Sequence, residues 1–559
     1  MIPRNAAAGA ALVLGVLTSS VGCASAPTPS PTAPTRGHAT PGAAPRGPLA
    51  WAPFDAETFA RAKRERKHIV LDGSAEWCHW CHVMEAVTYH DPEVRKLIDA
   101  HFLAAKVDVD ARPDVEERYA EYGWPATVIF SPDAIELGKY KGFLDPASFK
   151  DILSDVVAAG TKAGSGTPTE EPPIPDAPLT EEHLAWIARM TALLLDERWD
   201  EEQGSWGHEQ KVPLFYDNAW SLARGRAGGD VAKKRALFSL EKQLDIIDPV
   251  WGGIYQYSTD GDWKHAHFEK LMYFNAGALE NYAEAGKLTG DARFLKAAAA
   301  IKSYIDRFLS GPEGGFYTTQ DADLNAHERG KTFLTGHEYY AKDEAGRLAL
   351  GMPRVDTHEY PRENGLAIHA YCTYAKWLGD AGAVARAARA ADRIVQTHER
   401  KDGLLAHDAD ASPDHAAGSE AAVAHLADNA AFAWGLVALV DAGQKERLPK
   451  AIALVDAILA SMEDAKAGGF YAHTEDKGAV GIFAVRRKPF EDNVVMLRVL
   501  ADLARKSPDR AARYGRAIDR TLRAIATPDK IADRGRFLGD FLLALDETQG
   551  VRGARAVTR

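Results

Sequence analysis

The stretch that decides the fold is SAEWCHWCHVME, residues 74–85, which places two cysteines three positions apart where a helix is expected to begin. The apolar run from His68 to Leu71 predicts a short buried strand just before it. A cysteine at a helix N-terminus faces unpaired backbone amides and the positive end of the helix dipole, which favour a thiolate. Cys81 lies one turn after Cys78 and can resolve a mixed disulfide. The sequence therefore predicts a redox-active pair at a strand-to-helix junction.

The histidines of this motif leave other chemistries open. His79 and His82 can add positive charge or shuttle protons. Cys-x-x-Cys-His is also the attachment pattern of c-type haem, and Cys78, His79, Cys81 and His82 together offer four potential zinc ligands. A domain of the same fold without redox activity is a further alternative. We favour the redox pair, with no metal and no cofactor expected.

The elements around the motif follow the order β-α-β-α-β-β-α, which is the thioredoxin arrangement. A helical stretch over residues 51–67 precedes the strand that leads into the motif. The further elements expected are helices at 92–101, 114–122 and 146–159 and strands at 103–109, 126–130 and 138–143. Trp124-Pro125 opens one of these strands, and X–Pro bonds are the ones that adopt the cis form readily. We assign residues 51–158 to a thioredoxin-like domain.

The first residues predict export. Residues 1–23 resemble a lipoprotein-type signal peptide, because Arg4 precedes an apolar stretch too short to span a bilayer. Cys23 matches the lipidated cysteine of a lipobox, but Ser20 stands where a lipobox usually has Leu, so ordinary signal-peptidase cleavage is the alternative. Residues 24–50, rich in Ala, Pro, Thr and Ser, predict a disordered tether. We expect a periplasmic or cell-surface protein that contacts the membrane only through a lipid on Cys23.

The composition of the chain narrows the classes of protein to which it can belong. The chain has 559 residues, of which 46% are hydrophobic, so it is long enough for more than one domain. Its net charge of −12 gives no attraction to phosphate backbones, which argues against nucleic-acid binding. Four cysteines are too few for a disulfide framework in an exported chain of this length. Cys372, in an apolar helical stretch, is expected to be a buried small hydrophobe.

The rest of the chain contains a repeated sequence pattern. After a linker at 159–178, residues 179–549 have helical periodicity almost throughout. Gly-Gly turns recur, each followed by an asparagine that opens an apolar helix; these asparagines are Asn218, Asn275, Asn364, Asn429 and Asn493. We interpret each asparagine as a helix cap and each Gly-Gly as a tight turn.

This repeat, at intervals of roughly sixty residues, indicates stacked helical hairpins. Six outer helices are expected, at 180–198, 231–247, 291–310, 382–399, 445–463 and 507–526, with the last inner helix at 537–548. Six hairpins close into an (α/α)6 toroid. The predicted fold class is therefore α/β plus all-α, a thioredoxin-like domain followed by an (α/α)6 six-hairpin toroid.

The motif residues resemble one known family. The resemblance rests on Trp77 to Glu85, Lys106-Val107-Asp108, Arg112-Pro113-Asp114 and Gly123-Trp124-Pro125. These residues look like those of the thioredoxin-domain proteins related to spermatogenesis-associated protein 20, found in bacteria and animals. The resemblance implies a six-hairpin toroid similar to those of N-acylglucosamine 2-epimerases and some glycosidases. It also implies that Trp124-Pro125 lies beside the active cysteines, but it brings no firmly established reaction.

Loops that precede the inner helices are expected to gather at one end of the toroid and line a common cleft. The candidate substrate-binding residues there are Lys211, Tyr257, His267, Glu269, Lys270, Asp321, Asp323 and Glu363, with His425 and Asp492 as further members. Glycoside hydrolysis uses two carboxylates, and sugar epimerisation uses two opposed bases. A solvated rim or a buried ion-pair network explains the same residues equally well.

Three functions remain in competition. The first is an extracytoplasmic thiol–disulfide oxidoreductase, with the toroid as a platform for substrate or partner. The second is a carbohydrate-binding or sugar-processing toroid with a regulatory thioredoxin-like domain. The third is a non-enzymatic envelope scaffold with a Cys/His metal site. The expected partners are protein thiols and disulfides, or a carbohydrate.

Overall fold

The computed structural model describes residues 49–160, 179–328, 330–409 and 423–552. The predicted signal peptide, Cys23, almost all of the tether and most of the linker lie outside these residues. The described residues belong to one compact unit that begins at Leu49. Among them, no helix combines the length and the apolar character that crossing a membrane requires.

A four-stranded sheet forms the first part of this unit. Its strands are β1 (His68–Ser74), β2 (Phe102–Asp108), β3 (Ala126–Phe130) and β4 (Glu136–Lys141). Its helices are α1 (Ala56–Glu65), α2 (His79–Val87), α3 (Pro92–His101), α4 (Pro113–Tyr119) and α5 (Pro146–Ala159), with a 3-10 turn at Ala120–Tyr122. The strand order is β2-β1-β3-β4, with β1 parallel to β2 and antiparallel to β3. This is the predicted thioredoxin-like arrangement.

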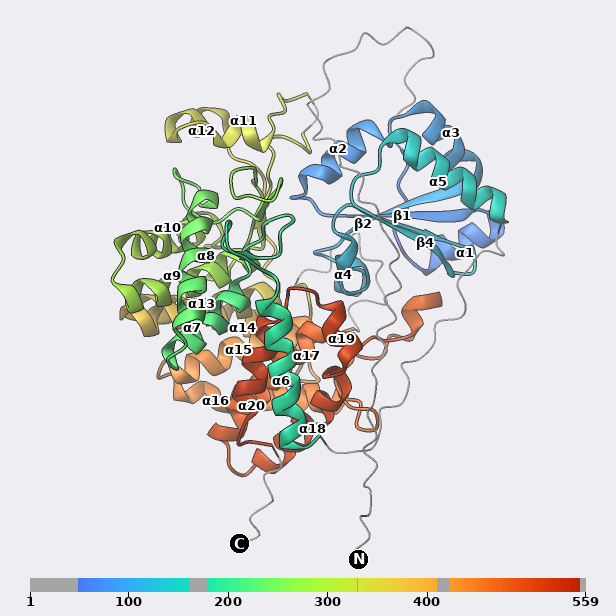
Figure 1. The fold of residues 1–559 in the computed structure, drawn as a ribbon. Coiled ribbons are helices and arrows are strands. Elements are labelled where there is room, and N and C mark those ends of the chain that lie inside the picture. The colour runs from blue at the N-terminus through green and yellow to red at the C-terminus, as the bar shows by residue number, and fades with distance from the viewer. Residues whose placement is uncertain (1–48, 161–178, 329, 410–422, 553–559) are drawn as a thin grey trace, which may run out of the picture. The chain divides into compact units, whose positions relative to one another are not determined.

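Alternate residues of the central strand face opposite layers of helices. Ile69 and Leu71 pack in one apolar cluster with residues of α1 and α4, whereas Val70 packs in another with residues of α2, α3 and α5. This period of two is what a strand covered on both faces requires. Figure 1 shows α3 and α5 on one side of the sheet and α1 and α4 on the other.

Two of the differences between the predicted and observed element boundaries have a clear local cause. The first helix begins at Ala56 rather than 51, because Asp55 caps it by accepting a hydrogen bond from the amide of Thr58 at 2.7 Å. The last strand is β4 (Glu136–Lys141) rather than 138–143, because a register shift at Phe130 pairs that residue with Glu136. Neither difference changes the order of the elements.

Six inner helices form a closed ring in the second part of the unit. They are α7 (Phe215–Arg226), α9 (Met272–Thr289), α13 (Pro361–Leu378), α15 (Leu426–Asp441), α17 (Phe490–Lys506) and α20 (Gly539–Thr548). Each contacts the next, and α20 returns to contact α7. A ring of six helices closed in this way is the inner layer of an (α/α)6 toroid.

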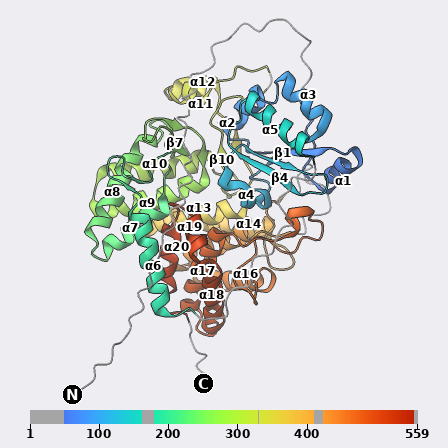
Figure 2. The same cartoon turned by 45° about the vertical axis from the view of Figure 1, so that its right-hand side comes forward.

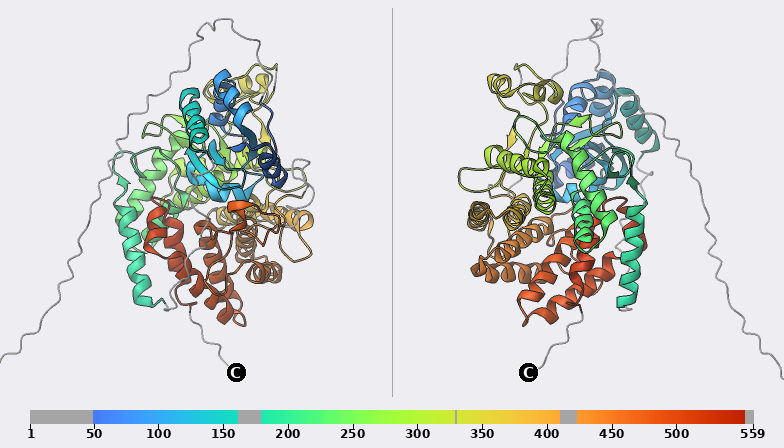
Figure 3. Two further views of the ribbon diagram at one scale, coloured as in Figure 1. Left: turned by 90° about the vertical axis from the view of Figure 1, so that its right-hand side faces the viewer. Right: turned by 60° about the vertical axis from the view of Figure 1, so that its left-hand side comes forward.

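Six outer helices complete the hairpins. They are α6 (Glu181–Asp196), α8 (Asp230–Gln243), α10 (Ala292–Phe308), α14 (Ala381–His398), α16 (Leu448–Ser461) and α18 (Ala511–Ile525). Each packs on one inner helix, and α6 packs on α20, so the first and last hairpins adjoin. Figures 2 and 3 show the teal α6 beside the red C-terminal helices. These twelve helices confirm the predicted fold class.

Short elements fill the connections. The helices among them are α11 (Gly336–Tyr340), α12 (Glu344–Leu350) and α19 (Pro528–Asp533). The strands among them are β5 (Trp199–Asp200), β6 (Ser205–Trp206), β7 (Tyr257–Ser258), β8 (Ala266–His267), β9 (Lys270–Leu271), β10 (Thr319–Gln320) and β11 (Val355–Asp356), and the 3-10 turns are Leu244–Ile246, Lys445–Arg447 and Gly481–Ala484. Because β9, β10 and β11 share one small sheet, the segments before α9, α11 and α13 come together.

The repeated asparagines do not cap helices. Asn275 accepts a hydrogen bond from the amide of Ile254 at 2.9 Å and donates to the carbonyl of the same residue. Three other repeats form the same two bonds, Asn364 with Phe316, Asn429 with Leu405 and Asn493 with Phe470. Each of these four asparagines therefore fastens a Gly-containing loop to an inner helix, which corrects the capping interpretation; Asn218 makes no such bonds within the described residues.

One toroid segment completes the core of the thioredoxin-like domain. Phe483, from the connection before α17, is 8% exposed and lies 5.5 Å from the ring of Phe54. Its ring also lies 6.3 Å from that of Phe130, in the central sheet. A Cβ on Gly481 would come within 2.2 Å of the carbonyl oxygen of Ala134, so the two segments approach closely. The sheet domain and the toroid are thus packed against each other.

Candidate functional site

The cysteine pair lies at the junction between β1 and α2. Cys78 is the N-cap residue of α2, and its sulfur accepts a hydrogen bond from the amide of Cys81 at 3.1 Å. The two residues are joined by a disulfide bond, and they are 3% and 4% exposed. Because the sulfurs are bonded to each other, this form offers neither of them to a haem or to zinc.

The Trp124–Pro125 pair lies directly before β3, the strand that neighbours β1. The peptide bond between these residues is cis. Ala126, the next residue, pairs with Gly73 of β1, two residues before the loop that carries the cysteines. A Cβ on Gly73 would lie 3.2 Å from the Trp124 ring, so that ring covers the end of β1. Strand register therefore brings Pro125 to the edge of the sheet from which α2 departs.

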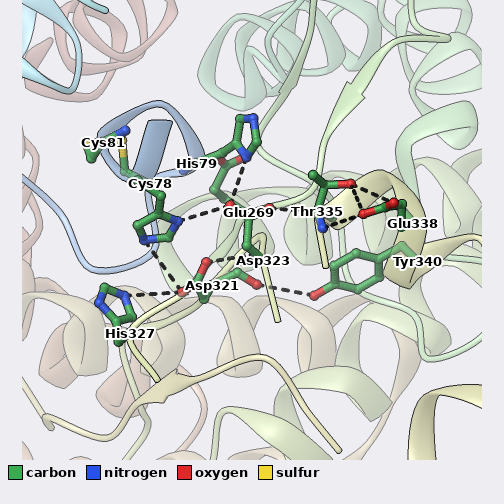
Figure 4. Close-up of polar contacts among 12 residues, drawn as sticks. Cys78, His79, Cys81, Glu269, Asp321, Asp323, His327, Thr335, Glu338 and Tyr340 are labelled. Carbon is green, nitrogen blue, oxygen red and sulfur yellow. Dashed lines mark hydrogen bonds and ion pairs between the residues drawn. A yellow bond between two sulfur atoms is a disulfide. The ribbon is translucent and has the colours of Figure 1, made fainter. Parts of the chain in front are cut away.

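Toroid loops bind the N-terminus of α2. A carboxylate oxygen of Glu269 accepts a hydrogen bond from the amide of His79 at 3.2 Å. Asp323 Oδ2 lies 2.8 Å from His79 Nδ1 and 3.0 Å from His82 Nδ1. The carbonyl of Trp77 accepts a hydrogen bond from the amide of Ala322 at 3.3 Å. Figure 4 shows these toroid carboxylates beside the disulfide, so both parts of the chain form one site.

The charges of this site are strongly perturbed. Burial raises the pKa of Glu269 to about 7, so its carboxyl group exchanges protons near neutral pH. Burial alone would raise the pKa of Asp323, but its hydrogen bonds and ion pairs with His79 and His82 outweigh this and lower it. Burial alone would likewise lower the pKa of His79, but the bond to Asp323 outweighs it and the pKa is raised. The Asp323 carboxylate and His79 thus stabilise each other's charged forms.

Two further candidate residues, His267 and Tyr257, stack their rings beside the cysteine motif. The ring of His267 stacks on that of Tyr257 at 4.2 Å, and it lies 6.1 Å from Trp80 and 6.2 Å from His79. Burial lowers the pKa of His267 to about 4, so this imidazole is neutral at physiological pH. Of the predicted substrate-binding residues, Tyr257, His267 and the three carboxylates at 269, 321 and 323 therefore meet the cysteine motif.

Two of the predicted substrate-binding residues are placed elsewhere. Lys211 and Lys270 have side chains that are 0% exposed, so neither reaches a cleft. Lys211 is paired with Asp200 at 2.7 Å, and Lys270 with Asp248 at the same distance. Each lysine also donates to a glycine carbonyl of the adjoining loop. Their role is to hold loops on inner helices, which corrects the substrate-binding interpretation.

Glu363 belongs to a second polar group at the mouth of the toroid. Its carboxyl lies 4.0 Å from Arg362, which forms two 2.9 Å bonds to Glu116 of α4. Burial raises the pKa of Glu363 to about 7. His425 and Asp492 are half-buried in the toroid, and the loss of solvent around them shifts their pKa values to about 3 and about 7. The structure does not bring these residues to the disulfide.

A cavity inside the helix ring offers little room. It has a volume of 20 Å³ and is lined in part by Tyr216, Tyr273, Glu280 and Trp434. A space of this size accommodates about one water molecule. It cannot hold a sugar ring, so it gives no support to the carbohydrate alternative.

Three functional candidates were missed in the sequence. Asp72 is 2% exposed in β1, and burial raises its pKa to about 6; a charged residue within an apolar strand was the available signal. Asp110 accepts a hydrogen bond from the Trp77 indole at 2.7 Å. His327 lies 3.4 Å from Asp321, and nothing in the sequence indicates that this loop reaches α2.

The fold and the site define a class of protein, in which a thioredoxin-like domain with a Cys-x-x-Cys disulfide shares a site with a six-hairpin helical toroid. The family described as "Protein of unknown function, DUF255" (Thioredox_DsbH) matches residues 43–158. Human spermatogenesis-associated protein 20 is 30% identical over 329 residues, which are 52% of this chain and 41% of that protein. The chain is therefore related to the thioredoxin-domain family of spermatogenesis-associated protein 20, which confirms the resemblance, although the matched part is less than half of that relative.

Two other similarities concern parts of the chain. The thiol:disulfide interchange protein DsbD of Cronobacter sakazakii is 33% identical over 99 residues, which are 17% of either chain. The crystal structure of a D-mannose isomerase aligns with 66% of this chain and 97% of its own, at 12% identity and a TM-score of 0.49.

Proposed function

We propose that this chain is a thiol–disulfide oxidoreductase whose active pair is Cys78 and Cys81. The observation that carries the proposal is the disulfide at the N-terminus of α2, with the amide of Cys81 directed at the Cys78 sulfur at 3.1 Å. Unpaired amides and the helix dipole stabilise negative charge at that position, so the reduced pair has its nucleophile at Cys78. The similarity to a thiol:disulfide interchange protein over 99 residues supports the same chemistry.

The exchange follows from the order of the two sulfurs. In the reducing direction, the Cys78 thiolate attacks one sulfur of a partner disulfide; a mixed disulfide forms, the partner's S–S bond breaks, and the released partner thiolate takes up a proton. Cys81 then loses its proton and attacks the Cys78 sulfur. This releases the second partner thiolate, which is also protonated, and restores the Cys78–Cys81 bond. The partner gains two electrons and two protons, and the pair loses them; oxidation of a partner dithiol is the reverse.

Glu269 is the proposed proton carrier for these steps. Its carboxyl bonds to the amide of His79, the residue that follows Cys78. Its pKa of about 7 is suited to both accepting and returning a proton at neutral pH. A carboxyl with an ordinary pKa would be ionised throughout and would return protons poorly. The toroid therefore contributes to the chemistry as well as to the walls of the site.

The toroid loops also select the partner. Cys78 is 3% exposed, and Asp323 and Ala322 hold a toroid loop against α2. A partner disulfide must displace this loop to reach the sulfur, so only segments that engage the loop gain access. We propose that the partners are proteins with accessible thiols or disulfides. The proposed compartment is extracytoplasmic, with a lipid anchor on Cys23, and this part rests on the N-terminal sequence alone.

The test is a disulfide-exchange assay on the purified protein. The wild type, reduced beforehand, is mixed with a peptide that contains one disulfide, and the release of peptide thiol is followed. We expect Cys78→Ser to abolish the release. Cys372→Ala removes the one thiol outside the pair in the described part of the chain, at a site buried in α13, and serves as the matched control. The proposal fails if Cys78→Ser exchanges as fast as the control.

A further inference from the structure

A group of potential ligands lies beside the disulfide and is not used by the exchange chemistry. His82 of α2, Asp321 and His327 present side-chain atoms within 4.8 Å of one another. His82 Nε2 lies 3.8 Å from Asp321 Oδ2, and His327 Nε2 lies 3.4 Å from the same oxygen. The two imidazole rings meet edge to face, with centroids 4.8 Å apart. Three side chains from two parts of the chain therefore converge on one point.

A backbone oxygen faces the same point. The carbonyl of Glu76 lies 3.1 Å from His82 Nε2 and 2.8 Å from His327 Nε2. These four separations run from 2.8 to 3.8 Å. Ligands at about 2.0–2.1 Å from a tetrahedral zinc ion are separated by roughly 3.3 Å, which falls in the middle of this range. The donor atoms need little movement to surround such an ion.

The surroundings orient these donors. His82 Nδ1 is 3.0 Å from the Asp323 carboxylate, which leaves Nε2 as the atom directed at the cluster. A carboxylate bound to the second ring nitrogen is the usual support of a metal-ligating histidine. Asp323 is fixed in turn, because its other oxygen accepts a hydrogen bond from the amide of Gly336 at 2.8 Å.

Asp321 supplies a second observation, a buried oxygen that lacks a well-formed hydrogen bond. The residue is 2% exposed, and its Oδ1 accepts a hydrogen bond from the amide of Asp323 at 2.8 Å. Its Oδ2, which faces the two imidazoles, is buried and accepts no well-formed hydrogen bond within the described residues, since the nearer imidazole nitrogen, His327 Nε2, is 3.4 Å away. A buried carboxylate oxygen that lacks a good hydrogen bond is costly, and a cation between it and the imidazoles removes that cost.

We propose that His82, Asp321 and His327 bind a zinc ion, with the Glu76 carbonyl as the fourth neighbour. Two imidazoles and one carboxylate form a donor set that suits zinc, and three protein side chains are what its non-structural sites commonly supply. The ion would fasten a toroid loop to α2 at the residue that directly follows Cys81, one helical turn from Cys78. This site differs from the Cys/His site considered from the sequence, and it is independent of the proposed exchange reaction.

The test measures zinc binding to the full chain after treatment with a chelator. Competition with a chromophoric zinc indicator gives stoichiometry and affinity, and we expect one ion per chain. His327→Ala should weaken binding at least about tenfold, and so should Asp321→Asn, which nearly preserves shape and decides the matter if the alanine variant does not fold. His183→Ala, on the exposed face of outer helix α6, is the matched control and should bind as the wild type does.

Three results would overturn the proposal. The first is the absence of stoichiometric zinc binding in the folded wild type. The second is unchanged affinity in both ligand variants. The third is loss of zinc binding in a Cys78→Ser, Cys81→Ser double variant that is folded, because the cysteines would then be the ligands.

Discussion

Replacing Glu269 by Gln should change how the stability of the protein depends on pH. Burial raises the pKa of this carboxyl from 4.5 to about 7, with His79 and Asp323 as the charged groups that face it. The folded state therefore holds a proton that the unfolded chain has released between these two values. The stability associated with Glu269 is fully present below its unfolded pKa and is lost as the pH rises through about 7.

The size of the effect follows from the shift. A rise from 4.5 to about 7, at about 1.4 kcal/mol per pH unit, corresponds to roughly 3 kcal/mol. Glutamine has a similar shape and does not titrate. The difference in free energy of unfolding, Glu269→Gln minus wild type, should therefore increase by roughly 2–3 kcal/mol as the pH rises from about 5 to about 8.

Urea unfolding at several pH values measures this difference. Glu201→Gln, at a side chain that is 84% exposed, is the control and should track the wild type at every pH. A gap between Glu269→Gln and wild type that stays constant across the range would refute the reasoning, because it would mean that the carboxyl is not held protonated by burial.

Three further changes test the packing and the site. Phe483→Ala should lower the free energy of unfolding by about 3 kcal/mol, measured by urea titration, because an aromatic ring that is 8% exposed leaves a cavity where the toroid enters the sheet domain. Asp323→Asn should lower the pKa of His79, measured by NMR titration of its imidazole, and an unchanged value would argue against their ion pair. Asp248→Ala should cost about 3–5 kcal/mol in thermal unfolding, because it leaves the buried Lys270 without its counterion; an unchanged melting temperature would contradict this.

The fold could be read from local patterns because each element has its own signal. The strand at 126–130 and the helices at 92–101 and 146–159 lie where they were predicted, and in the structure Asp91 and Asp145 cap the two helices. The hairpins could be counted because an asparagine recurs near the start of five of the six inner helices, after a Gly-containing loop. The role of the asparagine could not be predicted from the sequence, because its hydrogen bonds to the loops join residues 21 to 48 positions apart.

The site was only partly predictable for the same reason. Cys78, Cys81 and the two histidines share one short motif, and Glu269 and Asp323 were recognisable as candidate polar residues. Their meeting depends on how the toroid packs on α2, which no local pattern encodes: His79 and Asp323 are 244 positions apart.

For two lysines the prediction failed in the opposite way, because a functional role was expected where the structure shows a structural one. Lys211 and Lys270 precede inner helices, as substrate-binding residues were expected to do. Lys488 pairs with Asp464 at 3.0 Å in the same way as Lys270 pairs with Asp248, so the arrangement is a structural repeat. Sequence position alone does not distinguish a lysine that faces a cleft from one that is buried against a loop.

Trapping the covalent intermediate tests the central claim most directly. A Cys81→Ser protein, reduced and mixed with a disulfide-containing peptide, cannot resolve the mixed disulfide. Mass spectrometry of the digested product should find the peptide attached through its sulfur to Cys78. If no adduct forms, or if the peptide is found on Cys372 alone, the sulfur at the start of α2 is not the nucleophile and the proposed exchange is wrong.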